Sequence, residues 1–110
     1  MCASEYWEVA VLIIAMRKFG SALVTRKAGR DAYAAIAPNI RDGNVVFDFD
    51  GVDTVTNSFS DEVFGRLAFE FGMDELRART RFVNVSPFWA KVIRITMDTR
   101  AAQRPTLVCN

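Results

Sequence analysis

The hydrophobic positions of this chain change period part-way through residues 44–71, and this stretch organises the rest. Residues 45–49 form a short apolar run with the character of a strand, and Gly51 and a polar loop follow it. The next apolar residues recur at helical spacing: Phe59, Val63, Phe64, Leu67 and Phe71. The pattern predicts a strand, a loop and a helix with Ser58 at its start.

Ser58 and Asp61 match the S-x-x-[DE] pattern of a capping box. We expect the Ser58 hydroxyl to accept a hydrogen bond from the first helical turn. The alternative is that this hydroxyl is displayed at the helix start for modification or binding.

The N-terminal apolar run, residues 9–16, is too short to span a bilayer. Glu5 and Glu8 precede it and Arg17 and Lys18 follow it, which is the reverse of a signal peptide. We predict a buried strand, a turn at residues 19–21, and a second strand at residues 22–24 that completes a hairpin.

Thr25 is expected to cap a helix that Pro38 ends. The inner stripe of this helix is predicted to comprise Ala28, Ala32, Ala35 and Ile36. Arg26 belongs either to the solvated face or to a contact with a ligand or partner.

The second half begins at Gly72, which is expected to end the central helix. Residues 77–81 alternate arginine with small or polar residues, as in an anion or nucleic-acid patch or in a solvated approach to a strand. That strand is predicted at residues 82–85, and Ser86 and Pro87 begin a last helix with broad apolar coverage. Its apolar residues are Phe88, Trp89, Val92, Ile93, Ile95 and Met97.

The element order is therefore β-β-α-β-α-β-α. It predicts an α/β fold with a four-stranded mixed sheet, in which the opening hairpin is antiparallel and helices lie largely on one face. We expect a single domain over residues 1–99 and a flexible tail over residues 100–110.

Composition narrows the function. The chain has 110 residues, 51% of them hydrophobic, and nine are Phe, which predicts a folded domain. The net charge of +1 gives no electrostatic argument for nucleic acid or a membrane. The absence of histidine excludes Ser/His and Cys/His catalysis. Cys2 and Cys109 lie at the two ends without metal-ligand spacing, so no metal or cofactor is expected, and the default setting is reducing and cytoplasmic.

One motif suggests an enzyme. V-V-F-D-F-D-G resembles the first motif of haloacid dehalogenase-type phosphatases, in which the first aspartate is the nucleophile and the second a general acid. That resemblance implies Mg²⁺ chemistry at Asp48 and Asp50. It also requires a lysine and a further acidic pair on later strands of a large α/β core, and only about 60 residues follow Asp50. This is the alternative hypothesis.

Three segments together resemble another family. G-S-A-L-V-T-R-K-A-G-R, V-V-F-D-F-D-G-V-D-T-V-T-N-S-F-S-D-E and F-V-N-V-S-P are similar, in order and spacing, to the STAS-like domain of unknown function of bacterial proteins. The resemblance covers about residues 17–97 and extends to the STAS domains of anti-sigma-factor antagonists.

Those domains are non-catalytic switches in signalling. A serine kinase of the histidine-kinase-type ATPase fold binds them and phosphorylates a serine in a D-S-S-G context. The resemblance implies that Ser58 is the phosphoacceptor, with Asn57 at the other serine position. Thr56 replaces the aspartate of that context and Phe59 the glycine.

A helical wheel of about 100° per residue places Ser58, Glu62, Gly65 and Phe69 opposite the core stripe. With Asn57, these residues form the expected surface for a protein partner. A further alternative is a small ligand or nucleotide at the strand ends, close to Arg26 and Asn84. The sequence thus favours a regulatory binding module that is not an enzyme.

Overall fold

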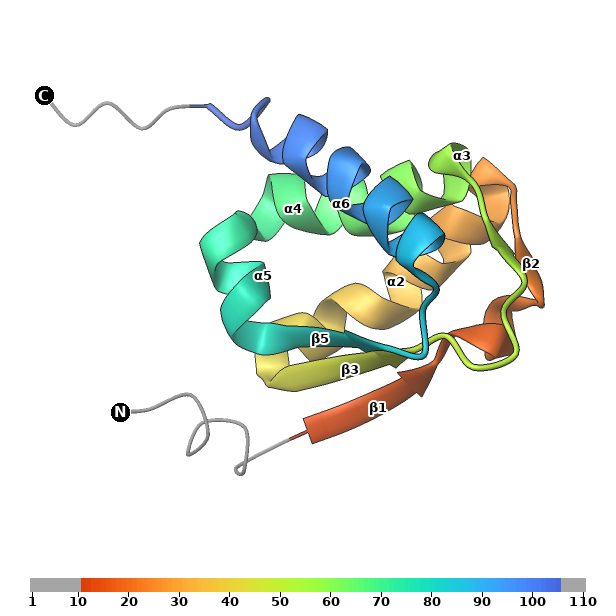
Figure 1. Cartoon of the computed structure of the whole chain (residues 1–110). Coiled ribbons are helices and arrows are strands. Elements are labelled where there is room, and N and C mark those ends of the chain that lie inside the picture. The colour runs from red at the N-terminus through yellow and green to blue at the C-terminus, as the bar shows by residue number, and fades with distance from the viewer. Residues whose placement is uncertain (1–10, 106–110) are drawn as a thin grey trace, which may run out of the picture.

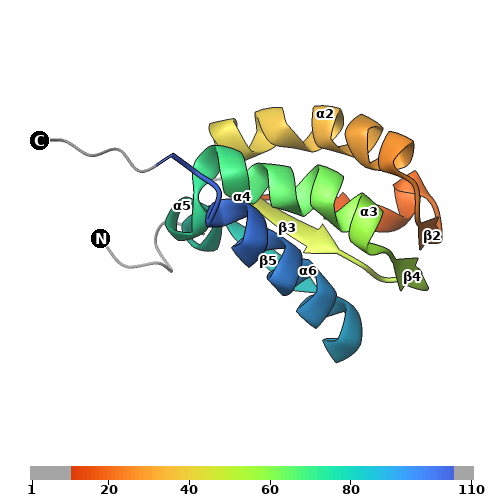
Figure 2. The same ribbon diagram turned by 90° about the horizontal axis from the view of Figure 1, so that it is seen from above.

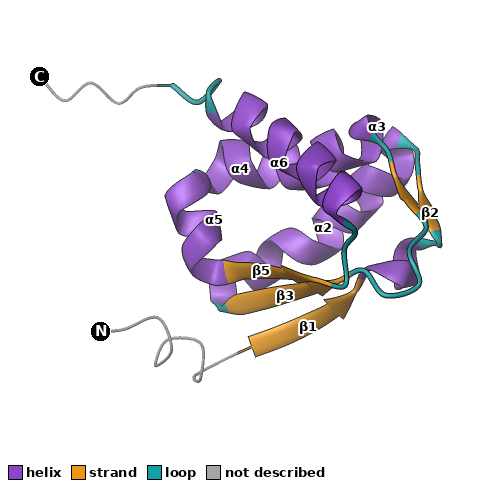
Figure 3. Ribbon diagram, viewed as in Figure 1, coloured by secondary structure: helices purple, strands orange, loops and turns teal. Residues whose placement is uncertain are grey.

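A central sheet of three parallel strands carries the fold. The computed structural model describes residues 11–105. Strands β1 (Val11–Ala15), β3 (Asn44–Asp48) and β5 (Thr80–Val83) lie in that order and are all parallel (Figures 1 and 3). Ile14 is opposite Phe47, and Phe47 is opposite Phe82. The α/β class is confirmed, but the four-stranded mixed sheet is wrong.

The helices lie on one face of this sheet (Figure 1). Both crossovers run in the same direction along the sheet, and right-handed crossovers of that kind place their helices on the same side. The other face keeps apolar side chains in solvent: Ile13 is 65% exposed and Val83 is 38% exposed. The expected buried first strand is therefore wrong in part, because among its described residues only Ile14 is buried in β1. Val9 and Ala10 lie outside the described residues.

The predicted hairpin does not form. A 3-10 turn (η1, Met16–Phe19) and Gly20 follow β1, and the side chain of Met16 is fully buried. Strand β2 (Ala22–Leu23) then pairs, in parallel, with β4 (Thr54–Val55) and not with β1. The apolar run of β2 was predicted correctly, but its partner is a segment about thirty residues away that local pattern does not indicate.

Helix α2 (Arg26–Asp42) begins at Thr25, as predicted. It does not end at Pro38, which lies on an exposed position inside its last two turns. A proline so near the end removes one backbone hydrogen bond and leaves the remaining turns intact. Ala32 and Ile36 face the core as expected, whereas Ala35 is exposed. The buried face also includes Gly29, Tyr33, Ala37 and Ile40.

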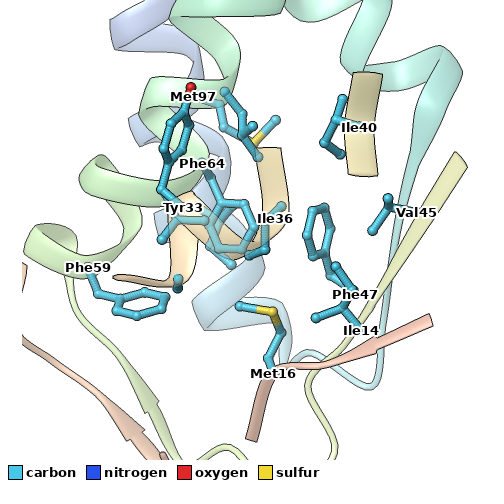
Figure 4. Packing of buried hydrophobic residues seen from close by; sticks show 14 of the residues in the cluster. Ile14, Met16, Tyr33, Ile36, Ile40, Val45, Phe47, Phe59, Phe64 and Met97 are labelled. Atoms are coloured by element: carbon cyan, nitrogen blue, oxygen red, sulfur yellow. The ribbon is translucent and has the colours of Figure 1, made fainter. Parts of the chain in front are cut away.

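A central helix of residues 57–71 lies between α2 and α6 (Pro87–Ala101), as Figure 2 shows. It comprises α3 (Asn57–Ser60), a π-helical turn (η2, Asp61–Gly65) and α4 (Arg66–Phe71). The predicted core stripe is confirmed, with Phe71 at its partly buried end. Phe64 meets Phe47 of the sheet edge-on, with ring centroids 5.2 Å apart (Figure 4).

Gly72 ends α4, as predicted, at φ +84°. An unexpected helix, α5 (Met73–Arg79), follows at once and contains Arg77 and Arg79. Strand β5 then begins at Thr80, two residues earlier than expected.

Ser86 caps α6 by accepting from the Trp89 N–H at 3.3 Å. The broad apolar coverage of α6 is wrong in part, because Phe88 is 64% exposed and Ile95 is 55% exposed. The helix continues to Ala101, past the predicted domain boundary at residue 99. Residues 106–110 of the predicted tail lie outside the described residues.

Candidate functional site

Two helices start side by side at one end of the molecule. Strands β2 and β4 are parallel neighbours, and each is followed within two residues by a capping threonine. The Thr25 hydroxyl accepts from the Ala28 N–H at 3.0 Å, and the Thr56 hydroxyl accepts from the Phe59 N–H at 3.3 Å. We call residues 24–26 and 56–58 the two-helix corner (right-hand end in Figure 1).

Thr56 also joins the two halves of the corner. Its hydroxyl donates to the Val24 carbonyl at 2.7 Å, and its backbone N–H donates to the Leu23 carbonyl at 3.0 Å. The prediction that Ser58 caps the central helix is therefore wrong. The capping-box partner, Asp61, is not available for that role because it lies in the π-helical turn and pairs with arginines.

The hydroxyl of Ser58 therefore takes no part in capping the central helix. Ser58 is the second residue of α3 and is half-buried. Within residues 11–105, its side chain has no hydrogen-bond partner. Asn57 beside it is exposed, and Val24 across the corner is 42% exposed. The corner thus presents a hydroxyl, an amide and an apolar side chain together.

Arg26 connects the corner to the π-helical turn. Its Nη1 lies 3.1 Å from both Asp61 Oδ2 and Glu62 Oε2. These two side-chain hydrogen bonds raise the pKa of Arg26 above its ordinary value. Arg100 of α6 approaches Asp61 from the other side at 3.4 Å, and Arg66 lies 3.9 Å from Glu62. Arg26 is therefore engaged with protein carboxylates.

The docking face predicted from the helical wheel does not exist as one surface. Gly65 is buried, and a β-carbon there would lie 2.9 Å from Arg100 Cγ on α6. Glu62 packs the opposite way, against Gly29 of α2. Of the four residues, Phe69 is exposed, at 39%, and Ser58 is half-buried. The wheel assumed one constant period, whereas the π-helical turn alters the winding and the helix has neighbours on both flanks.

The carboxyl ends of β3 and β5 are joined by Asp48 and Asn84. Asp48 Oδ1 accepts from Asn84 Nδ2 at 2.8 Å and from the Asp50 N–H at 3.0 Å. These hydrogen bonds, the Asn84 bond first, lower the pKa of Asp48. Asn84 adopts a left-handed backbone conformation, with φ +57°. The first aspartate of the D-x-D motif therefore serves here as a tie between two strands.

A polar pocket of about 270 Å³ adjoins this tie. Asp50, Asp53, Asn84 and Trp89 line it, and the Trp89 indole N–H donates to the Asp53 carbonyl at 3.1 Å. Arg26 does not line it, so the structure does not bring the two predicted ligand contacts together. Within residues 11–105, no three metal-binding side chains cluster closely enough to hold a metal ion. Phosphatase activity stays a prediction that an assay must test.

Sequence reasoning missed Thr56 and Arg100. The signal for Thr56 is a repetition: the segments A-L-V-T-R and T-V-T-N both place a threonine within two residues of the end of a strand. Arg100 was assigned to the tail, and no local pattern indicates its pairing with Asp61, 39 residues earlier.

Comparisons with known proteins identify the family. Residues 29–87 match the family described as a STAS-like domain of unknown function (DUF4325), and this match covers more than half of the chain. No curated protein and no solved structure matches. In the described part of the chain, no helix has the length and apolar character needed to cross a membrane. Residues 56–58 of the two-helix corner fall within the matched residues, whereas residues 24–26 precede them. Because the match covers more than half of the chain, the chain belongs to the STAS-like domain family.

Proposed function

We propose that this chain is a regulatory protein-binding module whose partner docks on the two-helix corner, with Ser58 as the switch. One observation carries the proposal. Thr56 caps the central helix, so the Ser58 hydroxyl lies in the first turn and has no hydrogen bond to lose within the described residues. An acceptor serine in that position can be modified without removing the helix cap.

The surroundings of Ser58 favour a phosphate. The second position of a helix offers unpaired backbone N–H groups and the positive end of the helix dipole. Asp61 and Glu62 lie within about one turn and would repel a dianion. However, Arg26, Arg66 and Arg100 surround these two acids, so the cluster has three cations for two anions.

Arg26 links phosphorylation of Ser58 to a change in the surface of the two-helix corner. It shares one nitrogen between Asp61 and Glu62, and its side chain is 53% exposed, so it can turn towards a phosphoserine. A partner seated on Val24 and Asn57 would then meet a bulky dianion and a displaced guanidinium. We therefore expect phosphorylation to weaken binding.

The partner follows from the family resemblance. STAS domains of anti-sigma-factor antagonists are bound by a serine kinase of the histidine-kinase-type ATPase fold, and we propose a partner of that kind. Asn57 and Val24 would supply the polar and apolar parts of the contact.

The test is affinity purification of the tagged chain from its source cell, combined with phosphopeptide mapping. Ser58→Ala should retain the partner, and Ser58→Asp should reduce its recovery by more than about tenfold, as for a charge placed in an interface. Thr99→Asp, an exposed hydroxyl position on α6, is the matched control and should leave recovery unchanged. An unmodified Ser58 together with normal recovery by Ser58→Asp would refute the switch.

A further inference from the structure

A second pocket lies between α5, β5 and α6, formed from other elements than the two-helix corner. Its volume is about 270 Å³. The apolar part of its lining comprises Met73, Phe82, Ala90, Ile93 and Met97. Ile93 and Met97 are buried, whereas Met73, Phe82 and Ala90 are half-buried, so the apolar lining reaches the surface.

Three polar residues also line this pocket: Arg77, Thr80 and Arg94. The Thr80 hydroxyl is already used, because it donates to the Leu76 carbonyl at 2.6 Å. Both arginines are exposed. The pocket therefore combines an apolar interior with two exposed arginine side chains in its lining.

The two arginines are poorly neutralised. Arg94 lies 3.7 Å from Asp98, a helix pair in which both side chains are more than half exposed. Such a pair contributes little. Arg77 makes no ion pair or side-chain hydrogen bond within residues 11–105. Two cationic side chains in the lining of one pocket favour an anionic ligand.

We propose that this pocket binds a small amphipathic carboxylate, such as a medium-chain or single-ring aryl acid. The planar guanidinium groups of Arg77 and Arg94 match the geometry of a carboxylate. The methionines at positions 73 and 97 can adapt to an apolar tail. The volume lies just below the range of about 300–1,000 Å³ that drug-sized ligands occupy, which favours a compact molecule. A nucleotide would leave its polar groups unpaired against this lining.

The methionine methyl groups offer a local readout. Octanoate should shift the ¹H–¹³C signals of Met73 and Met97 in a saturable way, while the signal of Met16, which is fully buried in the core, stays in place. Acetate supplies the charge without the tail, and octanol the tail without the charge. Each should bind at least about tenfold more weakly than octanoate, because each lacks one of the two interactions.

Charge-removing variants test the recognition. Arg77→Gln and Arg94→Gln should each weaken octanoate binding by about tenfold, the loss expected for one charge-assisted hydrogen bond. Both side chains are exposed, so the fold should survive. Arg30→Gln, at an exposed position on α2, is the matched control and should bind normally. The absence of saturable shifts with octanoate, equal binding of octanol, or unchanged binding by both pocket variants would overturn the proposal.

Discussion

The hydroxyl of Thr56 lies 2.7 Å from the carbonyl oxygen of Val24 and 3.3 Å from the N–H of Phe59. One side chain therefore caps the central helix and holds its start against the start of α2. A hydroxyl can do both because it donates once and also accepts. This places the structural role on Thr56 and leaves Ser58 free.

A pair of alanine variants separates these roles. Thr56→Ala should lower the free energy of unfolding by about 1–2 kcal/mol, because it removes the cap. Ser58→Ala should change it by less than about 0.5 kcal/mol, as at a surface position without a special contact. Denaturant unfolding measures both. Equal losses of unfolding free energy, or a larger loss for Ser58→Ala, would show that Ser58 and not Thr56 caps the helix.

The contact between α2 and the central helix depends on Gly29. A β-carbon at this position would lie 2.7 Å from Glu62 Cβ and 3.2 Å from the Phe59 carbonyl oxygen. Gly29→Ala should therefore destabilise the fold by about 1–3 kcal/mol through overpacking, although alanine favours a helix more than glycine does. Arg30→Ala, at the exposed neighbouring position, should be close to neutral. A stabilised Gly29→Ala variant would mean that the helices can separate at little cost.

The hydrogen bond between Asp48 and Asn84 should make the stability of the fold depend on pH in the acid range. The pKa of Asp48 is lower in the folded chain than its unfolded value of about 3.9. Its contribution to stability is therefore present above pH 3.9 and is lost as the pH falls through the folded pKa. Asn84→Gly removes the amide but suits the positive φ, so stability should fall less steeply below about pH 4 than in the wild type.

A comparison with Asn84→Ala completes this test. Alanine removes the same amide but must adopt φ +57°, which adds a cost of about 1–2 kcal/mol at every pH. Unfolding curves between pH 2 and 7 distinguish the two effects. An acid limb that is identical in wild type and Asn84→Gly would show that the tie does not depend on the charge of Asp48.

The pKa of Tyr33 predicts how the stability of the fold changes at alkaline pH. Burial, and then its hydrogen bond to Glu70, raise the pKa of Tyr33 to about 12. Because the folded pKa lies above the unfolded value of about 10, the stabilisation is complete below pH 10 and is lost as the pH rises towards 12. Tyr33→Phe should therefore lose less stability across this interval than the wild type.

Spectrophotometric titration of the phenol gives a direct measurement. In a Tyr6→Phe background, the Tyr33 absorbance change should centre near pH 12, and Glu70→Gln should lower the midpoint because it replaces the charged acceptor. A midpoint near 10 in the folded protein would contradict the buried hydrogen bond.

Short-range patterns in the sequence determined most of the elements. The apolar run of residues 45–49 predicted β3, the helical spacing from Phe59 predicted the core stripe, and Thr25, Gly72 and Ser86 marked helix ends correctly. These signals succeed because a cap or an amphipathic face depends on residues within about one helical turn. The STAS-like resemblance also came from the sequence and is confirmed.

The tertiary structure alone decided which elements meet. It paired β2 with β4, brought Arg100 to Asp61, and buried Gly65 under α6. None of these contacts has a local signal, since each joins segments that lie far apart along the chain. The π-helical turn altered the winding of the central helix, so that a constant period grouped residues that do not share a surface. The sequence by itself therefore determined most of the elements, and packing over long sequence distances determined the two-helix corner, because a site depends on which side chains lie together in space.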